Sequence, residues 1–219
     1  MDLSNRTLEI LKNFATINMS LVFNEGTTLK TVSPQKTILA EAKIEETFDR
    51  KFGVYDLNEL ISTISLIDNP KVELEDSGII IKGDGGVVAK YLYSQLELIV
   101  EPDPKKSLPV PDDSTEFALK KDSLKRVIRA AQVLGLPDII VEGKDGVISL
   151  SALDTKSKSS NDFKLSVDNS YEGSDFRAQF RVDNMVLMMV DYKVRIAEQY
   201  GYFVSTDDSL TYFIATEAE

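Results

Sequence analysis

Residues 101–115 read EPDPKKSLPVPDDST and stand near the middle of the 219-residue chain. This stretch holds four of the seven prolines, at positions 102, 104, 109 and 111, among Asp, Lys and Ser. Proline fixes the backbone angle φ and has no N–H group, so the stretch cannot form a helix or a central strand. We expect an extended, exposed linker that joins an N-terminal domain, residues 1–100, to a C-terminal domain, residues 116–219.

Both sides of this linker predict the same order of elements: helix, four strands, helix, three strands. Apolar residues at helical spacing indicate the helices, and β-branched or alternating runs between turn residues indicate the strands. On the N-terminal side the helices are expected at residues 5–14 and 57–67, and the strands at 18–23, 27–32, 37–42, 46–55, 71–75, 78–82 and 87–93. On the C-terminal side the helices are expected at residues 122–134 and 183–190, and the strands at 138–142, 147–153, 161–167, 176–182, 192–197, 201–205 and 210–216. We interpret the repeated order as a structural duplication.

Turn and capping residues add local detail to this pattern. Asn24, Glu25 and Gly26 predict a hairpin turn between the first two strands. Asp122 is the expected N-cap of the third helix, and Gly135 is the residue at which that helix is expected to stop. Two helices and several antiparallel strands in each domain predict an α+β fold in which both helices cover one face of the sheet. The four helices together are expected to form one continuous surface.

The composition narrows the classes of function. Hydrophobic residues make up 42% of the chain and charged residues 28%, which is typical of a folded protein. The chain has no Cys, which excludes disulfides and thiolate chemistry, and no His, the commonest general base and metal ligand. We therefore expect no enzyme activity, no metal site and no cofactor. No apolar run is long enough to span a membrane, and the N-terminus does not resemble a signal peptide.

Positive charge gathers in one segment of an otherwise acidic chain. The formal net charge is -11, yet residues 120–130 carry five cations against the single acid Asp122, a local charge of +4. On the predicted helix, Lys125 and Arg129 lie opposite the apolar side that Leu124 and Val127 begin. A lone basic helix face is usually only solvated, but this one opposes the global charge and belongs to the expected helical surface. Phosphates of duplex DNA are its predicted partner, without dependence on sequence.

Two short motifs resemble a known family. Residues 11–18, LKNFATIN, closely resemble the end of the first helix in the sliding clamps of T-even-type bacteriophages, and residues 54–58, VYDLN, resemble the start of their second helix. The resemblance implies a DNA clamp fold: a homotrimer of two-domain subunits forming a closed ring, with helices around the hole. It implies a ring that encircles duplex DNA and tethers the replicative DNA polymerase, with no hydrolysis of its own. The resemblance further implies two kinds of partner, a clamp loader ATPase and transcription factors for late genes. It also implies that the protein is located in the cytoplasm of an infected bacterial host.

The resemblance also implies three kinds of site. The residues expected to face DNA are Arg6, Lys12, Lys120, Lys121, Lys125, Arg126 and Arg129. The residues expected at the subunit interface, by element position, are Val87, Val88, Tyr91 and Tyr93 on one subunit and Phe163, Leu165 and Val167 on its neighbour. A pocket for partner peptides is expected at Leu108, Val110, Phe213 and Ala215. Leu108 and Val110 could equally do no more than pin the linker to the sheet.

Two other classes of function stay open from the residues alone. One is an acidic, β-rich scaffold or adaptor that does not encircle DNA and whose basic helix meets an acidic partner. The other, which ranks far behind, is a hydrolase without His that uses carboxylates or a Ser–Lys pair. Retention on circular but not on linear DNA distinguishes a clamp from a scaffold.

Overall fold

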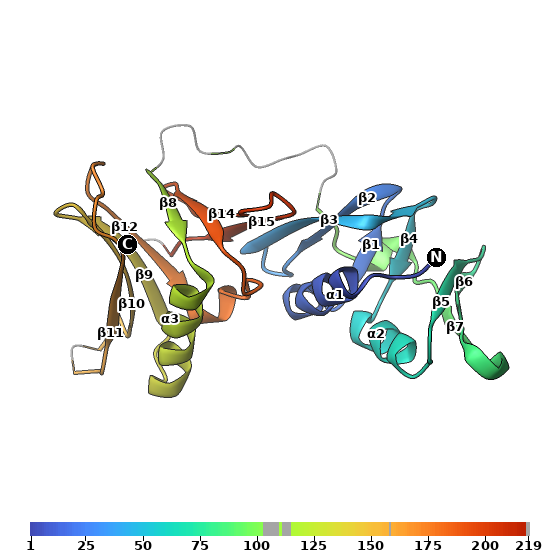
Figure 1. The fold of residues 1–219 in the computed structure, drawn as a ribbon. Helices are drawn as coiled ribbons and strands as arrows, with labels where there is room; N and C mark the ends of the chain where they lie inside the picture. The colour runs from blue at the N-terminus through green and yellow to red at the C-terminus, as the bar shows by residue number, and fades with distance from the viewer. Residues whose placement is uncertain (103–109, 111–114, 158, 218–219) are drawn as a thin grey trace. The chain divides into compact units, whose positions relative to one another are not determined.

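The structure, a computed structural model, describes residues 1–102, 110, 115–157 and 159–217 (Figure 1). The chain divides into two compact units, Met1–Ser107 and Leu108–Glu219, and each is described by itself. Most of the linker expected at residues 101–115 lies outside the described residues. Its last residue, Thr115, already belongs to a strand.

The first unit follows the order that its sequence predicts. Its elements are α1 (Asn5–Ile17), β1 (Leu21–Phe23), β2 (Gly26–Val32), β3 (Ile38–Phe48), β4 (Phe52–Val54), α2 (Leu57–Ser65), β5 (Lys71–Leu74), β6 (Gly78–Lys82) and β7 (Val88–Leu92), with short 3-10 turns at Asp84–Gly86 and Leu96–Leu98. Both helices have conventional caps. The hydroxyl of Ser4 accepts from the N–H of Thr7 at the start of α1, and the carboxylate of Asp56 accepts from Asn58 and Glu59 at the start of α2.

Both helices lie on one side of this unit and contact each other (Figure 1). α1 buries Ile10, Leu11, Phe14 and Ile17, and α2 buries Leu57, Leu60, Ile61 and Ile64. In β3, the burial alternates from residue to residue along most of its length, so one face of the strand packs inward and the other is wetter. The expectation that both helices cover one face is confirmed for this unit.

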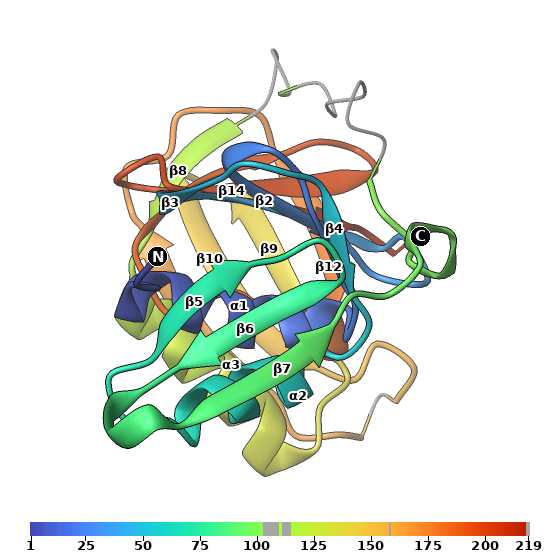
Figure 2. The same ribbon diagram turned by 90° about the vertical axis from the view of Figure 1, so that its right-hand side faces the viewer.

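Strand pairing in the first unit corrects one local prediction. β1 does not form a hairpin with β2, because β1 pairs with β4, about thirty residues further along the chain, and β2 pairs with β3. The turn at Asn24 joins the two strands but does not decide their partners. β5, β6 and β7 form a separate antiparallel sheet in which β7 is an outer strand (Figure 2).

The second unit repeats the order with two changes. Its elements are β8 (Thr115–Leu119), α3 (Lys121–Leu134), β9 (Asp138–Lys144), β10 (Val147–Leu153), β11 (Phe163–Asp168), β12 (Phe176–Arg181), a 3-10 turn at Val182–Asn184, β13 (Tyr192–Ile196), β14 (Tyr200–Ser205) and β15 (Leu210–Ala215). The sequence pattern missed β8. β9 and β10 meet at Asp145 and Gly146, whose φ angles of 51° and 79° are those that a tight type I′ hairpin turn requires.

Two sheets enclose the core of the second unit. One has the order β11-β10-β9-β12 and carries α3, which packs against β9, β10 and β11. In the other, β13 pairs with β8 and β14, and β14 pairs with β15. Phe180 of β12 meets Phe203 of β14 edge to face, and Tyr192 packs against both Phe203 and Tyr212. The contact of Phe180 with Phe203 joins the two sheets, whereas Tyr192, Phe203 and Tyr212 all lie on the second sheet.

The prediction of a helix at residues 183–190 is wrong. Only the 3-10 turn at Val182–Asn184 forms there, so the described residues hold three α-helices instead of the four expected. Met185 and Leu187, two positions apart, are buried, whereas Met189 is exposed, so residues 185–190 pack as an irregular loop and not as a helix. None of the helices in the described part of the chain is long and apolar enough to cross a membrane. The antiparallel α+β fold itself is confirmed.

The two units match even at a position that no sequence pattern marks. In the second unit β8 pairs with β13, the first strand after the loop at residues 185–190. In the first unit Met1 takes the corresponding place beside β5, where the N–H of Val72 donates to the carbonyl of Met1 at 2.8 Å. The duplication therefore includes a strand position ahead of the first helix of each unit.

Candidate nucleic-acid interface and partner surfaces

α3 separates apolar from basic residues on two faces. Leu124, Val127 and Ala131 are buried against the sheet. The cationic residues on the exposed face are Lys121, Lys125, Arg126 and Arg129. The helix ends as its sequence predicts, at Gly135 in the left-handed conformation with φ 65°.

The start of α3 differs from the prediction. Asp122 is not the N-cap but lies in the first turn, and Lys120 is the N-cap without a side-chain capping bond. The carboxylate of Asp191 caps the helix instead: Oδ1 accepts from the N–H of Lys121 at 2.8 Å and Oδ2 from Nζ of Lys120 at 3.0 Å. The hydrogen bond from the Lys121 N–H, followed by that from Lys120, lowers the pKa of Asp191.

The remaining cations of this face are available to an external anion. Within the described ranges no ion pair involves Lys125, Arg126 or Arg129. Two turns of helix thus present several positive charges together, on a rigid element with its apolar side anchored. We name the side chains of Lys121, Lys125, Arg126 and Arg129 the basic face of α3.

The helices of the first unit carry much less positive charge. Arg6 is half-buried, with Nη1 at 3.9 Å from a carboxylate oxygen of Glu9, and Lys12 is exposed on α1. α2 contains no Lys or Arg at all, and its exposed residues include Asn58 and Ser62. Arg6 and Lys12 belong to the first unit, whereas Lys121, Lys125, Arg126 and Arg129 lie together on one helix of the second.

The two strands expected at the subunit interface are both outer strands. β7 is the last strand of the sheet β5-β6-β7, and β11 is the first of β11-β10-β9-β12. On β7 and just before it, Val88 is 59% and Val87 51% exposed. On β11, Phe163, Leu165 and Val167 are half-buried. Exposed apolar residues on an outer strand are a liability unless another strand covers them.

The two tyrosines of the expected interface contact their own unit, whereas the valines are exposed. The hydroxyl of Tyr91 donates to the carbonyl of Asp56 at 3.0 Å, beneath the start of α2. Burial raises the pKa of Tyr91. The ring of Tyr93 stacks on Phe52 with centroids 4.8 Å apart. Both tyrosines therefore contact the interior of their own unit.

The expected peptide pocket is partly described. Leu108 lies outside the described residues. Val110 is exposed and borders a hollow of about 300 Å³ over β13 and β14, together with Arg195 and Tyr202. The ring of Tyr202 lies 4.9 Å from that of Phe213, which is buried, and Ala215 is half-buried at the end of β15. Tyr202 therefore connects the hollow beside Val110 with Phe213.

A larger hollow has no signature in the sequence. It measures about 630 Å³ and lies between β12, the β13–β14 turn and the end of the chain; its walls include Phe176, Gln179, Ile196, Gln199 and Thr216. The N–H of Glu217 donates to the carbonyl of Gln179 at 2.9 Å, and that of Thr216 donates to Gln199 at 3.0 Å. No local motif marks this hollow, because three distant segments form it.

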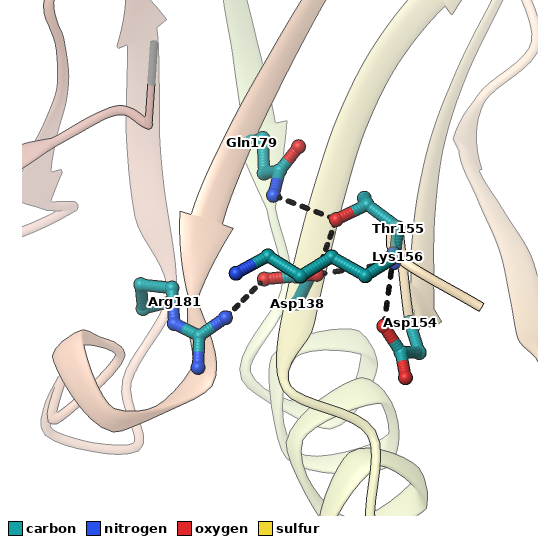
Figure 3. A network of polar contacts seen from close by, with 6 residues as sticks. All are labelled: Asp138, Asp154, Thr155, Lys156, Gln179 and Arg181. Carbon is teal, nitrogen blue, oxygen red and sulfur yellow. Dashed lines mark hydrogen bonds and ion pairs between the residues drawn. The ribbon is translucent and has the colours of Figure 1, made fainter. Parts of the chain in front are cut away.

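A buried polar network ties the sheet of the second unit together (Figure 3). The carboxylate of Asp138 accepts hydrogen bonds from Arg181, at 2.9 Å, and from the hydroxyl of Thr155, at 2.7 Å. Gln179 donates in turn to the Thr155 hydroxyl at 3.2 Å. Both oxygens of the Asp138 carboxylate therefore have structural partners. Nowhere in the described ranges do three or more His, Cys, Asp or Glu side chains gather as metal ligands do.

Comparisons with known proteins decide the family. The family model described as "gp45 sliding clamp, C terminal" matches residues 116–218, and the model "DNA polymerase processivity factor" matches residues 4–91. The sliding clamp of Vibrio phage KVP40 is 36% identical over 221 residues, covering 100% of both chains. This chain belongs to the sliding clamp family.

Further relatives agree with this assignment. The sliding clamp of Escherichia phage RB69 is 28% identical over 226 residues, which cover 100% of this chain and 98% of that protein. Among solved structures, A. fulgidus PCNA bound to the C-terminal region of FEN-1 has a TM-score of 0.73 at 14% identity, covering 97% of this sliding clamp and 95% of that chain. That likeness shows a shared fold. The family expected from residues 11–18 and 54–58 is confirmed.

Proposed function

We propose that this sliding clamp forms a ring around duplex DNA, tethers the replicative DNA polymerase to it and hydrolyses nothing itself. The observation that carries the proposal is the basic face of α3 in a chain with a net charge of -11. Duplex DNA carries one phosphate per roughly 1.7 Å of its axis, so a few cations suffice to attract it. Contacts to phosphate read no base sequence, as a protein that moves along DNA requires.

Two outer strands support the proposed closure of the ring. β7 of one subunit would pair with β11 of the next, which would cover Val87, Val88, Phe163, Leu165 and Val167. A head-to-tail contact of this kind closes into a ring when the rotation per subunit allows it, and the resemblance to T-even-type clamps implies three subunits. Tyr91 and Tyr93 would support β7 from within their own unit instead of contacting the neighbour.

Partner proteins would dock on the second unit. The hollow beside Val110, with Tyr202 and Phe213 below it, offers apolar and aromatic surface to a short peptide of the polymerase, the clamp loader ATPase or a transcription factor. The larger hollow beside Gln179 extends this region toward the chain's end. With such partners, the protein would act in the cytoplasm of an infected bacterial host.

A topological experiment tests the central claim. Clamp loaded onto nicked circular DNA should stay bound through gel filtration, and cutting the circle once should release it. An electrostatic binder that does not encircle DNA would be retained equally on both forms. Equal retention would contradict the ring and favour the scaffold.

A second experiment tests the basic face of α3. The triple substitution Lys125→Ala, Arg126→Ala, Arg129→Ala removes three exposed cations without touching the buried side of the helix. We expect weaker DNA binding and a dependence of log Kobs on log salt that is flatter by about 0.9 for each phosphate that the variant no longer neutralises. The native mass should not change. Unaltered binding and synthesis by the triple variant would show that DNA does not meet α3.

A further inference from the structure

Asp191 lies opposite the start of α3 because the sheet places it there. β13 pairs with β8 so that Tyr192 faces Leu119. Asp191 comes directly before β13 and Lys120 directly after β8, so the two residues adjoin this pair. The N–H of Thr206 also donates to the carbonyl of Asp191 at 3.1 Å. Backbone pairing on both sides therefore fixes the position of this carboxylate.

Both oxygens of the Asp191 carboxylate are used at the same helix end. One accepts from the N–H of Lys121 and the other from the ammonium group of Lys120, at 2.8 and 3.0 Å. A carboxylate is stabilised at a helix N-terminus, where N–H groups lack partners within the helix. Lys120 is thus held to an acid 71 residues away in the chain, unlike Lys125 and Arg129 of the same helix.

We infer that Asp191 limits the positive charge with which α3 meets DNA, by holding Lys120 back from the phosphates. The inference rests on the proposed function, since it concerns how strongly the same helix holds the duplex. Residues 120–130 carry five cations; subtracting Asp122 and Asp191 leaves +3. A moving clamp needs enough attraction to stay aligned but not enough to stop, and each cation that neutralises a phosphate adds about 0.9 to the salt slope.

The substitution Asp191→Asn separates the two tasks of this side chain. The amide oxygen of Asn can still accept the hydrogen bond from Lys121, whereas the negative charge that holds Lys120 is lost. We expect a salt slope steeper by about 0.9 for each α3 that contacts the duplex. Fluorescence anisotropy with a short linear duplex, which can enter a closed ring from its end, measures this slope over a salt series. Circular dichroism and native mass verify that helix and assembly are unchanged.

Substitution of Lys120 provides a test that does not depend on Asp191→Asn folding correctly. In the wild-type background, Lys120→Ala should flatten the slope less than half as much as Lys125→Ala. In the Asp191→Asn background, Lys120→Ala should cancel the steepening. Equal effects of Lys120→Ala and Lys125→Ala in the wild-type background would overturn the inference, because Lys120 would then contact phosphate.

The outcomes separate this inference from the proposed function. If Asp191→Asn leaves the slope unchanged while the triple α3 variant flattens it, α3 contacts DNA but Asp191 does not limit that contact. If the triple variant changes nothing, the DNA-binding assignment of α3 fails. A steeper slope that Lys120→Ala reverses supports both.

Discussion

Asp138 and Arg181 are cross-strand partners in the β9–β12 ladder, joined by a hydrogen bond of 2.9 Å from Nη1 to Oδ1. The side chain of Asp138 is 1% exposed, whereas that of Arg181 is 36% exposed. The other carboxylate oxygen accepts from the N–H and the hydroxyl of Thr155, at 3.2 and 2.7 Å. A buried charge therefore fastens the residues after β10 to both β9 and β12.

Asp138→Ala should lower the free energy of unfolding of the second unit by about 2–3 kcal/mol, because Thr155 loses its acceptor and Arg181 its counter-charge. Urea unfolding followed by circular dichroism measures this. Asp154→Asn is the matched control, since Asp154 accepts one local hydrogen bond from Lys156. It should stay within about 0.5 kcal/mol of the wild type. Equal free energies of unfolding for the Asp138→Ala and control variants would show that the network does not stabilise the second unit.

Glu46→Gln should destabilise the first unit by about 1–2 kcal/mol. The carboxylate of Glu46, on β3, accepts hydrogen bonds from the N–H of Ser4 and the hydroxyl of Thr7 at the start of α1. Gln retains one acceptor oxygen but replaces the other with a donor. The neighbouring Glu45 is exposed, so Glu45→Gln is the control and should change the free energy of unfolding little. Similar losses in both variants would mean that overall charge matters and the capping contact does not.

Protonation of Asp138 and Glu46 should account for part of the stability that the protein loses in acid. Burial would raise the pKa of each, but hydrogen bonds from Thr155 and the charge of Arg181 hold the pKa of Asp138 below its ordinary value, as those from Ser4 and Thr7 do for Glu46. A folded-state pKa below the unfolded one stabilises the protein above about pH 4, and this is lost as the pH falls through the folded-state pKa.

The loss of stability between pH 7 and pH 3 should therefore be smaller in Asp138→Asn and Glu46→Gln than in the wild type, although both variants start lower. Urea unfolding at the two pH values gives the comparison. An identical drop in all three proteins would assign the acid sensitivity to other carboxylates.

Gly135→Ala should cost about 1 kcal/mol, because Gly135 ends α3 with φ 65° and a Cβ atom is disfavoured in that conformation. A Cβ placed there meets no atom within 4 Å, so the cost is conformational and not a clash. Gly135→Asn should cost less, since Asn tolerates the left-handed region better than Ala. Thermal unfolding of the three proteins ranks them. A higher melting temperature for Gly135→Ala than for Gly135→Asn would contradict the conformational explanation.

Val88→Lys should weaken self-association, since it places a charge on the outer strand β7. Leu66→Lys is the control: Leu66 is 84% exposed at the end of α2 and belongs to no strand. Sedimentation equilibrium should give a mass near 24.4 kDa for Val88→Lys and a multiple of it for the control and wild type. An unshifted mass for Val88→Lys would place the subunit contact elsewhere.

The sequence predicted what depends on neighbouring residues. Apolar spacing located α1, α2 and α3, and Gly135 marked the end of α3 because a left-handed residue is a local requirement. The same reasoning failed at residues 183–190: Met185, Met188 and Met189 match helical spacing, but the core instead buries Met185 and Leu187. Tertiary packing decided between two patterns that the segment supports equally.

Distant partners explain the remaining differences. Phe23 ends a strand that looks like half of a hairpin, yet it pairs with Phe52. Asp122 is well placed in the sequence to cap α3, but Asp191 does so from the residue before β13, about 70 positions further along the chain. The basic face of α3 was predictable because all its members share one helix. The hollow beside Gln179 was not, because its walls come from three segments.

The uneven distribution of cations over the helices affects how a ring could travel. α2 has no Lys or Arg, and on α1 the exposed Lys12 is accompanied by Arg6, which has an acid beside it, so each subunit would meet the phosphates chiefly at α3. Between such segments the duplex keeps its water and counterions. A displacement by one base pair then replaces each contact with an identical one, and the free energy along the axis stays nearly level, which is the condition for one-dimensional diffusion.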